Sequence, residues 1–246
     1  MKLCVPITAP SREGALRAIE EAAAAADMVE LRMDAIGDVP LSSLLRKAKG
    51  VASPPAVVVT NRLWSEGGLR PIPNGESFEA SERRRVGVLI EAVERGVEFV
   101  DVELATDERL RDSLREAIAR RGFRTALMVS RHDFRRTPPL PRLKEILDRC
   151  GEAGASIAKI VTTAARPEDN LRILELIVHA RRRENRIVAF CMGGAGRVSR
   201  LAAPLMGAEF GFACLREDEG SATGQLTVRQ MRQGMKMLEA GRDKSA

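Results

Sequence analysis

The stretch Val29-Glu30-Leu31-Arg32-Met33-Asp34 alternates aliphatic and charged side chains at every position. Because successive side chains of a β-strand point to opposite faces, this run predicts a strand with one apolar and one polar face. The run Val100-Asp101-Val102-Glu103-Leu104 repeats the pattern. Strands whose aliphatic face packs beneath helices, while polar groups gather at the strand ends, are typical of an α/β barrel.

On both sides of this stretch, the chain alternates short apolar runs with amphipathic segments of ten or more residues. We expect strands at 3–6, 28–34, 56–61, 99–104, 125–132, 156–162, 187–192 and 209–215. We expect helices near 11–26, 40–49, 78–95, 106–121, 141–153, 167–184, 197–206 and 226–239. Eight such units predict one α/β domain, a (β/α)8 TIM barrel like that of class I aldolases, over residues 1–240, with a disordered tail at 241–246. A doubly wound open sheet is the alternative fold.

Composition excludes some classes of protein. The chain has 246 residues and a formal charge of +6, but only 3% aromatic residues and no tyrosine, so we expect no nucleic-acid partner. It contains no run of 18 apolar residues and no leader peptide, which predicts no membrane association and a cytoplasmic location. Four widely spaced cysteines predict buried thiols rather than a zinc site.

Lys159 is the first candidate for chemistry, because it interrupts the apolar run Ala155-Ser156-Ile157-Ala158-Lys159-Ile160-Val161. Burial disfavours a charged amine, and a neutral lysine amine can attack a ketone. The alternative is a lysine whose stem is buried and whose ammonium reaches solvent.

His132 is the second candidate, since it ends the fifth predicted strand and the chain has only two histidines. At a strand end it is placed either for proton transfer or for a structural hydrogen bond. After the seventh strand, the turn Gly193-Gly194-Ala195-Gly196 opens a helix that carries Arg200. Backbone amides and an arginine in such a turn favour an anion, although a flexible turn explains the glycines equally well.

Together these segments resemble type I 3-dehydroquinate dehydratase, and the likeness covers almost the whole chain. The matching segments, in order, are Glu30-Leu31-Arg32-Met33-Asp34, Arg62 with Glu66-Gly67-Gly68, Ser130-Arg131-His132-Asp133-Phe134 with Thr137-Pro138, Lys159, Gly196-Arg197-Val198-Ser199-Arg200, and Ser221-Ala222-Thr223-Gly224-Gln225. No single segment is decisive, but their joint order and spacing are specific.

The resemblance implies a lyase of the shikimate pathway that needs neither a metal nor a cofactor. It implies that Lys159 forms an imine with the C3 ketone of 3-dehydroquinate, and that His132 removes a C2 proton and later protonates the departing C1 hydroxyl. Glu66 is implied to hydrogen-bond His132 and fix its tautomer. The products of this syn elimination, the third step of the pathway, are water and 3-dehydroshikimate.

The resemblance also implies seven substrate-binding residues, Glu30, Arg32, Arg62, Met192, Arg200, Ser221 and Gln225. Of these, Arg200 is implied to bind the substrate carboxylate, while Ser221 and Gln225 lie on a loop that closes over the substrate. Two residues depart from the family pattern, Cys191 for serine and Thr223 for proline. We expect the second to leave the closing loop less rigid.

Three other functions fit parts of this pattern. A Schiff-base aldolase or transaldolase would bind a phosphorylated substrate at the glycine turn. A metal-dependent isomerase or lyase would use Glu30, Asp101, Glu103 and His132 as ligands. An RNA-binding module would use the arginine clusters.

The resemblance implies a homodimer as well. Apolar residues of the last predicted helix, Met231, Met235 and Leu238, are expected either to form the dimer contact or to cap the core.

Overall fold

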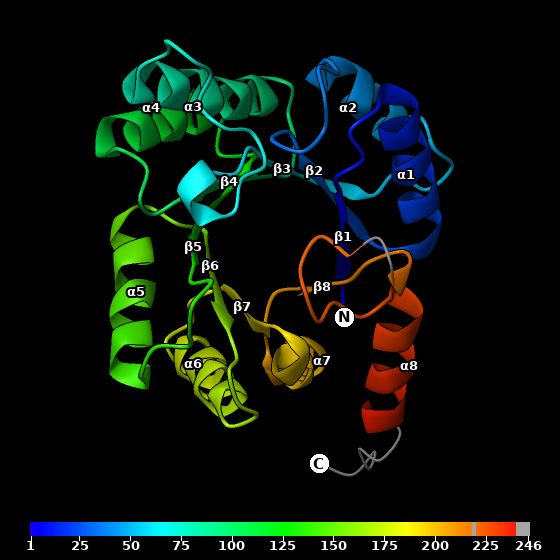
Figure 1. Cartoon of the computed structure of the whole chain (residues 1–246), viewed down its shortest axis with the longest axis vertical. Coiled ribbons are helices and arrows are strands. Elements are labelled where there is room, and N and C mark those ends of the chain that lie inside the picture. The colour runs from blue at the N-terminus through cyan, green and yellow to red at the C-terminus, as the bar shows by residue number, and fades with distance from the viewer. Residues whose placement is uncertain (218–219, 240–246) are drawn as a thin grey trace.

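The computed structural model describes residues 1–217 and 220–239, and in this part of the chain helices surround a sheet of strands (Figure 1). The strands are β1 (Leu3–Ile7), β2 (Met28–Arg32), β3 (Ala56–Thr60), β4 (Phe99–Glu103), β5 (Ala126–His132), β6 (Ile157–Thr163), β7 (Ile187–Met192) and β8 (Gly211–Phe212). The α-helices are α1 (Arg12–Ala25), α2 (Leu41–Lys49), α3 (Phe78–Glu94), α4 (Glu108–Arg120), α5 (Leu140–Glu152), α6 (Asp169–Arg182), α7 (Arg197–Met206) and α8 (Val228–Glu239). Two 3-10 turns, η1 (Trp64–Glu66) and η2 (Gly194–Gly196), follow β3 and β7.

All strand pairs are parallel, and the order β7-β6-β5-β4-β3-β2-β1-β8 follows the chain with a single wrap from β1 to β8. The helices succeed one another around the periphery in the same order (Figure 1). A doubly wound sheet would instead reverse its strand order on either side of β1. The predicted (β/α)8 barrel is therefore confirmed, and its closure is nearly complete.

The seam between β7 and β8 explains why the eighth strand is shorter than the predicted 209–215. Gly211 and Phe212 pair with β1, whereas towards β7 the backbone makes one bond, from the Glu209 N–H to the Ile187 carbonyl (2.8 Å). Beyond Phe212 the chain turns away, and Cys214 pairs with Thr227 instead. The loop between Cys214 and Thr227 thus has both ends fastened beside the barrel mouth.

Two apolar layers hold the barrel. The larger lies between the sheet and the helices and includes the outward Val29, Leu31, Val100 and Val102, as the alternating pattern predicted. The smaller fills the barrel interior with Cys4, Met28, Val58, Met128, Ile157, Val161, Val188, Phe190, Met192, Phe210 and Phe212. The inward-facing polar residues therefore lie above this apolar layer, at one end of the barrel.

Several local predictions can be compared with the structure. Helix α1 begins after Ser11, whose Oγ accepts a hydrogen bond from the Gly14 N–H (3.1 Å). All four cysteines are buried, as predicted. Met231 and Met235 are buried in the core, which is the second of the two predicted alternatives rather than a dimer contact, and Leu238 of that set is exposed. No described helix combines the length and apolar character needed to cross a membrane. The predicted tail at 241–246 and residue 240 lie outside the described residues.

Candidate active site

One cavity at the C-terminal ends of the strands contains all ten residues that the sequence placed in the site. Its lining includes Glu30, Arg32, Arg62, Glu66, His132, Lys159, Met192, Arg200, Ser221 and Gln225. Parallel pairing explains the convergence, because Ser130 lies opposite Lys159 and His132 opposite Val161. Paired residues point to the same face of a sheet, so Lys159 lies one pleat deeper in the barrel than His132.

Lys159 projects into the barrel and is only 3% exposed, so its amine does not reach bulk solvent. Its Nζ lies 2.7 Å from Asp101 Oδ2 and 3.0 Å from Glu30 Oε1. The Phe212 ring lies beneath it, with its centroid 4.5 Å away. The sequence predicted burial among aliphatic side chains that would favour a neutral amine. The structure instead places two carboxylates within hydrogen-bond distance of the amine.

Asp101 joins the lysine to a second cation. Its Oδ2 accepts a hydrogen bond from Arg62 Nη2 (2.8 Å), while Arg62 Nη1 reaches Glu103 Oε1 (2.6 Å) and Ser130 Oγ (2.7 Å). Burial opposes ionisation of Asp101, but Arg62 and Lys159 outweigh it and hold the pKa of Asp101 well below its usual range. Arg62 therefore lines the cavity with a guanidinium group already neutralised by Asp101 and Glu103.

His132 stands nearer the mouth with Glu66 from η1 behind it. Glu66 Oε2 accepts a hydrogen bond from the His132 backbone N–H (2.8 Å) and lies 3.2 Å from His132 Nδ1. Glu66 is only 3% exposed, so it is no solvated loop carboxylate. Burial, followed by the charges of Arg62 and Lys159, lowers the pKa of His132 well below its usual value. The imidazole is therefore neutral at neutral pH, the state that a general base requires.

A glycine lets the Glu66 turn approach β5 this closely. Gly67 ends η1 with a left-handed φ of 84°, and a Cβ there would lie 2.4 Å from Phe134 Cζ. The Phe134 ring in turn stacks on the His132 ring, with centroids 6.3 Å apart. Only glycine fits this conformation and this contact, which explains the Glu66-Gly67-Gly68 segment physically.

Arg32 and Asp34 organise the loop that carries Glu66. Arg32 donates two hydrogen bonds to the Asp34 carboxylate, at 2.9 and 2.7 Å. The same carboxylate accepts the backbone N–H groups of Arg62 and Leu69, both at 3.1 Å. Arg32 thus lines the cavity, but its charge is paired, and Asp34 fixes both ends of the loop.

Arg200 differs from these arginines because its charge has no acidic partner among the described residues. It is 2% exposed, and within residues 1–217 and 220–239 its buried Nε has no hydrogen-bond partner, while its Nη2 reaches the Thr223 carbonyl (3.3 Å). Its guanidinium carbon lies 4.5 Å from the Phe190 ring centroid. Burial lowers the pKa of Arg200 to about 10, which still leaves a cation at neutral pH. An unpaired buried guanidinium in a cavity is a binding site for an anion.

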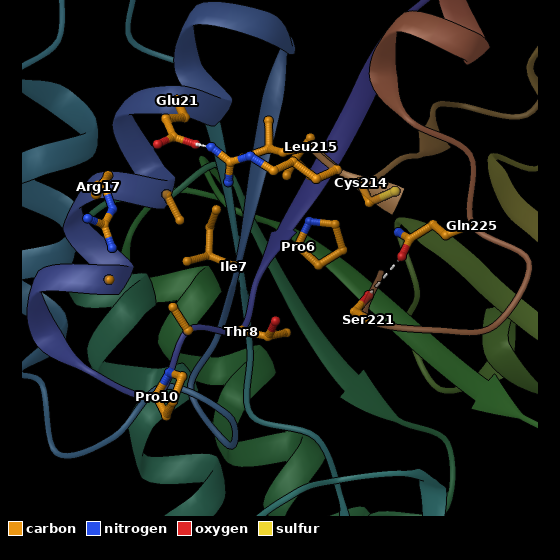
Figure 2. Close-up of a pocket in the computed structure, with 15 residues that line it drawn as sticks. Pro6, Ile7, Thr8, Pro10, Arg17, Glu21, Cys214, Leu215, Ser221 and Gln225 are labelled. Carbon is orange, nitrogen blue, oxygen red and sulfur yellow. Dashed lines mark hydrogen bonds and ion pairs between the residues drawn. The ribbon is translucent and has the colours of Figure 1, made fainter. Parts of the chain in front are cut away.

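The loop after β8 covers one side of the cavity. Ser221 and Gln225 face each other across 3.4 Å and also line a neighbouring hollow beside Pro6 and Cys214 (Figure 2). The Thr223 carbonyl accepts the Gly193 N–H (3.1 Å) as well as Arg200. Gly224 has a φ of 77°, and a Cβ there would lie 2.1 Å from the Gly193 oxygen. These contacts fasten the loop to the glycine turn even though residue 223 is threonine.

The same contacts define what the glycine turn does. The Gly193 N–H is bonded to Thr223 and the Gly196 N–H to the Gly193 carbonyl (3.0 Å). Two of its amides are thus committed within the chain, which weighs against a phosphate site of the aldolase kind. The other departure, Cys191, is buried with its Sγ 3.4 Å from Thr162 Oγ1, so a serine-sized group fits there.

The acidic groups that suggested a metal site have other partners. Asp101 and Glu103 contact Arg62, and Glu30 contacts Lys159 and the Thr60 hydroxyl (2.8 Å). Within residues 1–217 and 220–239, no cluster of three or more His, Cys, Asp or Glu side chains is arranged to hold a metal ion.

Sequence reasoning missed three residues that contact the candidate site residues directly. Asp101 was considered only as a metal ligand, yet it contacts Lys159 directly. Asp34 was placed on the polar face but given no role. Arg131 was quoted within a motif, and its guanidinium binds the second oxygen of Glu66 at 2.6 Å. The alternation of β2 and β4 was the available signal for the two aspartates, whereas nothing in the sequence indicates the reach of Arg131.

The amino-acid sequence of this chain is similar to those of known proteins. The model of the family described as type I 3-dehydroquinase matches residues 3–242. The 3-dehydroquinate dehydratase of Desulfotalea psychrophila is 34% identical over 231 residues, which cover 94% of this chain and 95% of that protein.

Solved structures agree on the fold. The 3-dehydroquinate dehydratase of Geobacillus kaustophilus is 29% identical and aligns with a TM-score of 0.83, covering 98% of this chain and 92% of the other. The type I 3-dehydroquinate dehydratase of Clostridium difficile aligns with a TM-score of 0.85, covering 98% of this chain and 93% of the other. The two sequences are 23% identical, so this comparison shows a shared fold and nothing further. The similarity in each case extends over nearly the whole barrel.

Proposed function

The chain belongs to the type I 3-dehydroquinase family, and from that premise we propose that it dehydrates 3-dehydroquinate to 3-dehydroshikimate through an imine on Lys159. The reaction is a syn elimination and the third step of the shikimate pathway. The observation that carries the proposal is a single cavity lined by a buried lysine, a neutral histidine and a buried arginine that has no acidic partner in the described part of the chain.

Covalent catalysis begins at Lys159. After the ammonium has released a proton, the Nζ lone pair adds to C3 of the ketone, and the former carbonyl oxygen leaves as water. The product is a protonated imine, which withdraws electrons and acidifies the C2 hydrogens. Asp101 and Glu30, at 2.7 and 3.0 Å from Nζ, are placed to stabilise the positive imine nitrogen.

His132 performs both proton transfers. Its neutral imidazole takes a C2 proton, and the electrons of that C–H bond move into the imine to give an enamine. The enamine electrons then return and expel the C1 hydroxyl, which takes the proton from His132 and leaves as water. Hydrolysis of the remaining imine frees 3-dehydroshikimate and restores Lys159. One imidazole serves both steps because both groups leave from the same face.

Glu66 and Arg200 supply orientation. An ionised Glu66 accepts the His132 Nδ1–H across 3.2 Å, which leaves the Nε2 lone pair free to act as the base. Arg200 binds the substrate carboxylate, since its Nε has no partner among the described residues and its charge faces the cavity. Glu30, Arg32, Arg62, Met192, Ser221 and Gln225 complete the wall around the ring.

Reductive trapping tests this function. Borohydride added with 3-dehydroquinate is expected to inactivate the protein and to add one reduced ligand mass to the peptide that contains Lys159. Lys159→Ala should abolish both turnover and labelling, whereas Lys236→Ala, at an exposed position of α8, should change neither.

A second variant separates imine formation from elimination. His132→Ala should still be labelled at Lys159, while its kcat falls about 10²- to 10⁴-fold because the general base is gone. Label on another lysine, or a fully active His132→Ala protein, would contradict the assigned roles.

The family resemblance also supports a homodimer in the cytoplasm, which we propose for the intact enzyme. Cell fractionation, with activity followed in each fraction, measures the location. Activity recovered with the membranes or outside the cell would refute it.

A further inference from the structure

Arg131 occupies an unusual position relative to the catalytic histidine. It precedes His132 in β5, and consecutive strand residues point to opposite faces. Its guanidinium nevertheless returns to the mouth of the barrel, where Nη1 lies 2.6 Å from Glu66 Oε1. The side chain is 43% exposed, whereas the carboxylate that it binds is almost fully buried. The solvent-facing guanidinium of Arg131 therefore contacts Glu66, the carboxylate that lies behind the proposed general base His132.

The two oxygens of Glu66 have separate tasks. Oε2 faces His132, with the backbone N–H at 2.8 Å and Nδ1 at 3.2 Å, while Oε1 faces Arg131. A carboxylate held at both oxygens by neighbouring residues of one strand cannot rotate away from the imidazole. Arg131 is absent from the lining of the substrate cavity, so any influence that it has on the reaction acts through Glu66.

We propose that Arg131 is a positioning residue that keeps Glu66 ionised and oriented, and thereby keeps the His132 proton on Nδ1 with Nε2 free as the base. This inference rests on the proposed function for its kinetic consequences. Its structural consequence, the tautomer of His132, can be measured without substrate.

The electrostatic surroundings of Glu66 show why a cation is needed there. Burial raises the pKa of Glu66, and the backbone N–H of His132 and the charge of Arg131 partly offset that rise. Glu103 of β4 raises it as well, and Arg62, which follows β3, lowers it. Without Arg131 the pKa of Glu66 rises further, because one lowering contribution is lost and the others stay in place.

Protonation of Glu66 would reverse the hydrogen bond to the imidazole. A carboxylic acid donates its proton, so Nδ1 becomes the acceptor and the imidazole carries its own proton on Nε2. That tautomer cannot accept the C2 proton. Activity is therefore present above the pKa of Glu66 and is lost as the pH falls through it. Raising that pKa moves the acid limb of the kcat profile to higher pH.

The kinetic experiment compares three variants across pH. Arg131→Met removes the charge, Arg131→Lys keeps it, and Arg135→Met alters an exposed arginine of the same segment whose side chain makes no bond with any described residue. We expect the acid limb of Arg131→Met to move up by about one pH unit, with kcat about tenfold lower on that limb and an unchanged KM. Arg131→Lys should restore most of the kcat, and Arg135→Met should match the wild type.

Other charges also face the imidazole and must stay constant in the comparison. Arg62, Lys159, Asp101 and Arg32 act on His132, and none of them is altered in these variants. A difference between Arg131→Met and the wild type therefore reports the contact with Glu66. An unshifted acid limb, or a loss expressed only in KM, would overturn the proposal.

Nitrogen-15 spectra of the two histidines give the second, substrate-free measurement. His179 lies in α6, far along the chain from β5, and serves as the internal reference. The wild-type His132 signals should show a protonated Nδ1, and Arg131→Met should shift them towards the Nε2-protonated form while His179 stays unchanged. Identical His132 signals in both proteins would refute the inference. Failure of borohydride trapping with a shifted His132 would instead count against the proposed function alone.

Discussion

Three arginine residues line the cavity, and among the described residues Arg32 and Arg62 have carboxylate partners whereas Arg200 has none. Arg32 and Arg62 each lie within 3 Å of a carboxylate, so their charges are compensated within the chain. Arg200 is buried as well, but among the described residues its contacts are a backbone carbonyl and an aromatic ring. A buried cation without an anion is costly, and a bound carboxylate removes that cost. Substrate binding should therefore depend on Arg200 more than on its neighbours.

Replacing Arg200 by lysine should raise KM about 10- to 100-fold, because an ammonium cannot form the bidentate contact that a guanidinium makes with a carboxylate. We expect a smaller change in kcat, since the proposed proton transfers run through His132 and not through Arg200. Steady-state kinetics with 3-dehydroquinate measures both constants. The matched control is Arg197→Lys, at an exposed position of the same helix. Equal KM values for the two variants would contradict the role of Arg200.

A chain of buried ion pairs links two elements, helix α3 and strand β6, which carries Lys159. Arg85 of α3 contacts Glu82 and Glu103, both at 2.6 Å, and Glu103 contacts Arg62. Arg62 reaches Asp101, which reaches Lys159. Each link is buried, so each charge depends on its neighbours for compensation. Helix α3 thus shares in positioning a lysine with which it has no direct contact.

Arg85→Met should lower the free energy of unfolding by about 3 kcal/mol, because it leaves Glu82 and one oxygen of Glu103 buried without a partner. Urea denaturation followed by circular dichroism measures the change. Arg83→Met is the control, since Arg83 pairs with Glu79 on the solvent face and is 67% exposed there. Its loss should cost less than about 1 kcal/mol. Similar losses for the two variants would mean that the buried chain is not the cause.

At the scale of the whole molecule, the eight units close the barrel with one weak seam. Strands β1 to β7 share regular parallel ladders, whereas β8 contributes two residues and joins β7 through a single backbone bond. The segment that follows is thereby free to form the loop with Ser221 and Gln225 instead of extending the sheet. The incomplete closure thus places Ser221 and Gln225, which we propose to bind substrate, at the wall of the cavity.

Sedimentation equilibrium tests the proposed homodimer, which should have twice the 26.9 kDa mass of one chain. The contact cannot depend on Met231 and Met235, because both pack into the core of the monomer. Larger apolar side chains remain exposed in and beside the loop after β3, where Trp64 is 55% and Phe78 62% exposed. A mass of one chain across the accessible concentrations would refute the dimer.

Most of the fold follows from local patterns. Alternation in β2 and β4 identified an inner polar and an outer apolar face, and the eight repeats predicted a barrel before any contact was known. The errors fall at the ends of elements. The predicted strand at 209–215 was too long, because its ladder with β1 covers only Gly211 and Phe212 and Cys214 pairs with Thr227 instead.

The barrel and the set of side chains at its mouth follow from the amino-acid sequence, because the period of a strand and the direction of parallel crossovers leave few other arrangements. The pairing of those charges does not follow from it and depends on the folded chain. Whether Lys159 meets carboxylates, whether Arg200 is left alone, and whether Arg131 reaches back to Glu66 depend on distances between residues far apart in the chain. Electrostatic interactions depend on such distances and on burial, and neither quantity is encoded in the spacing of residues along one strand.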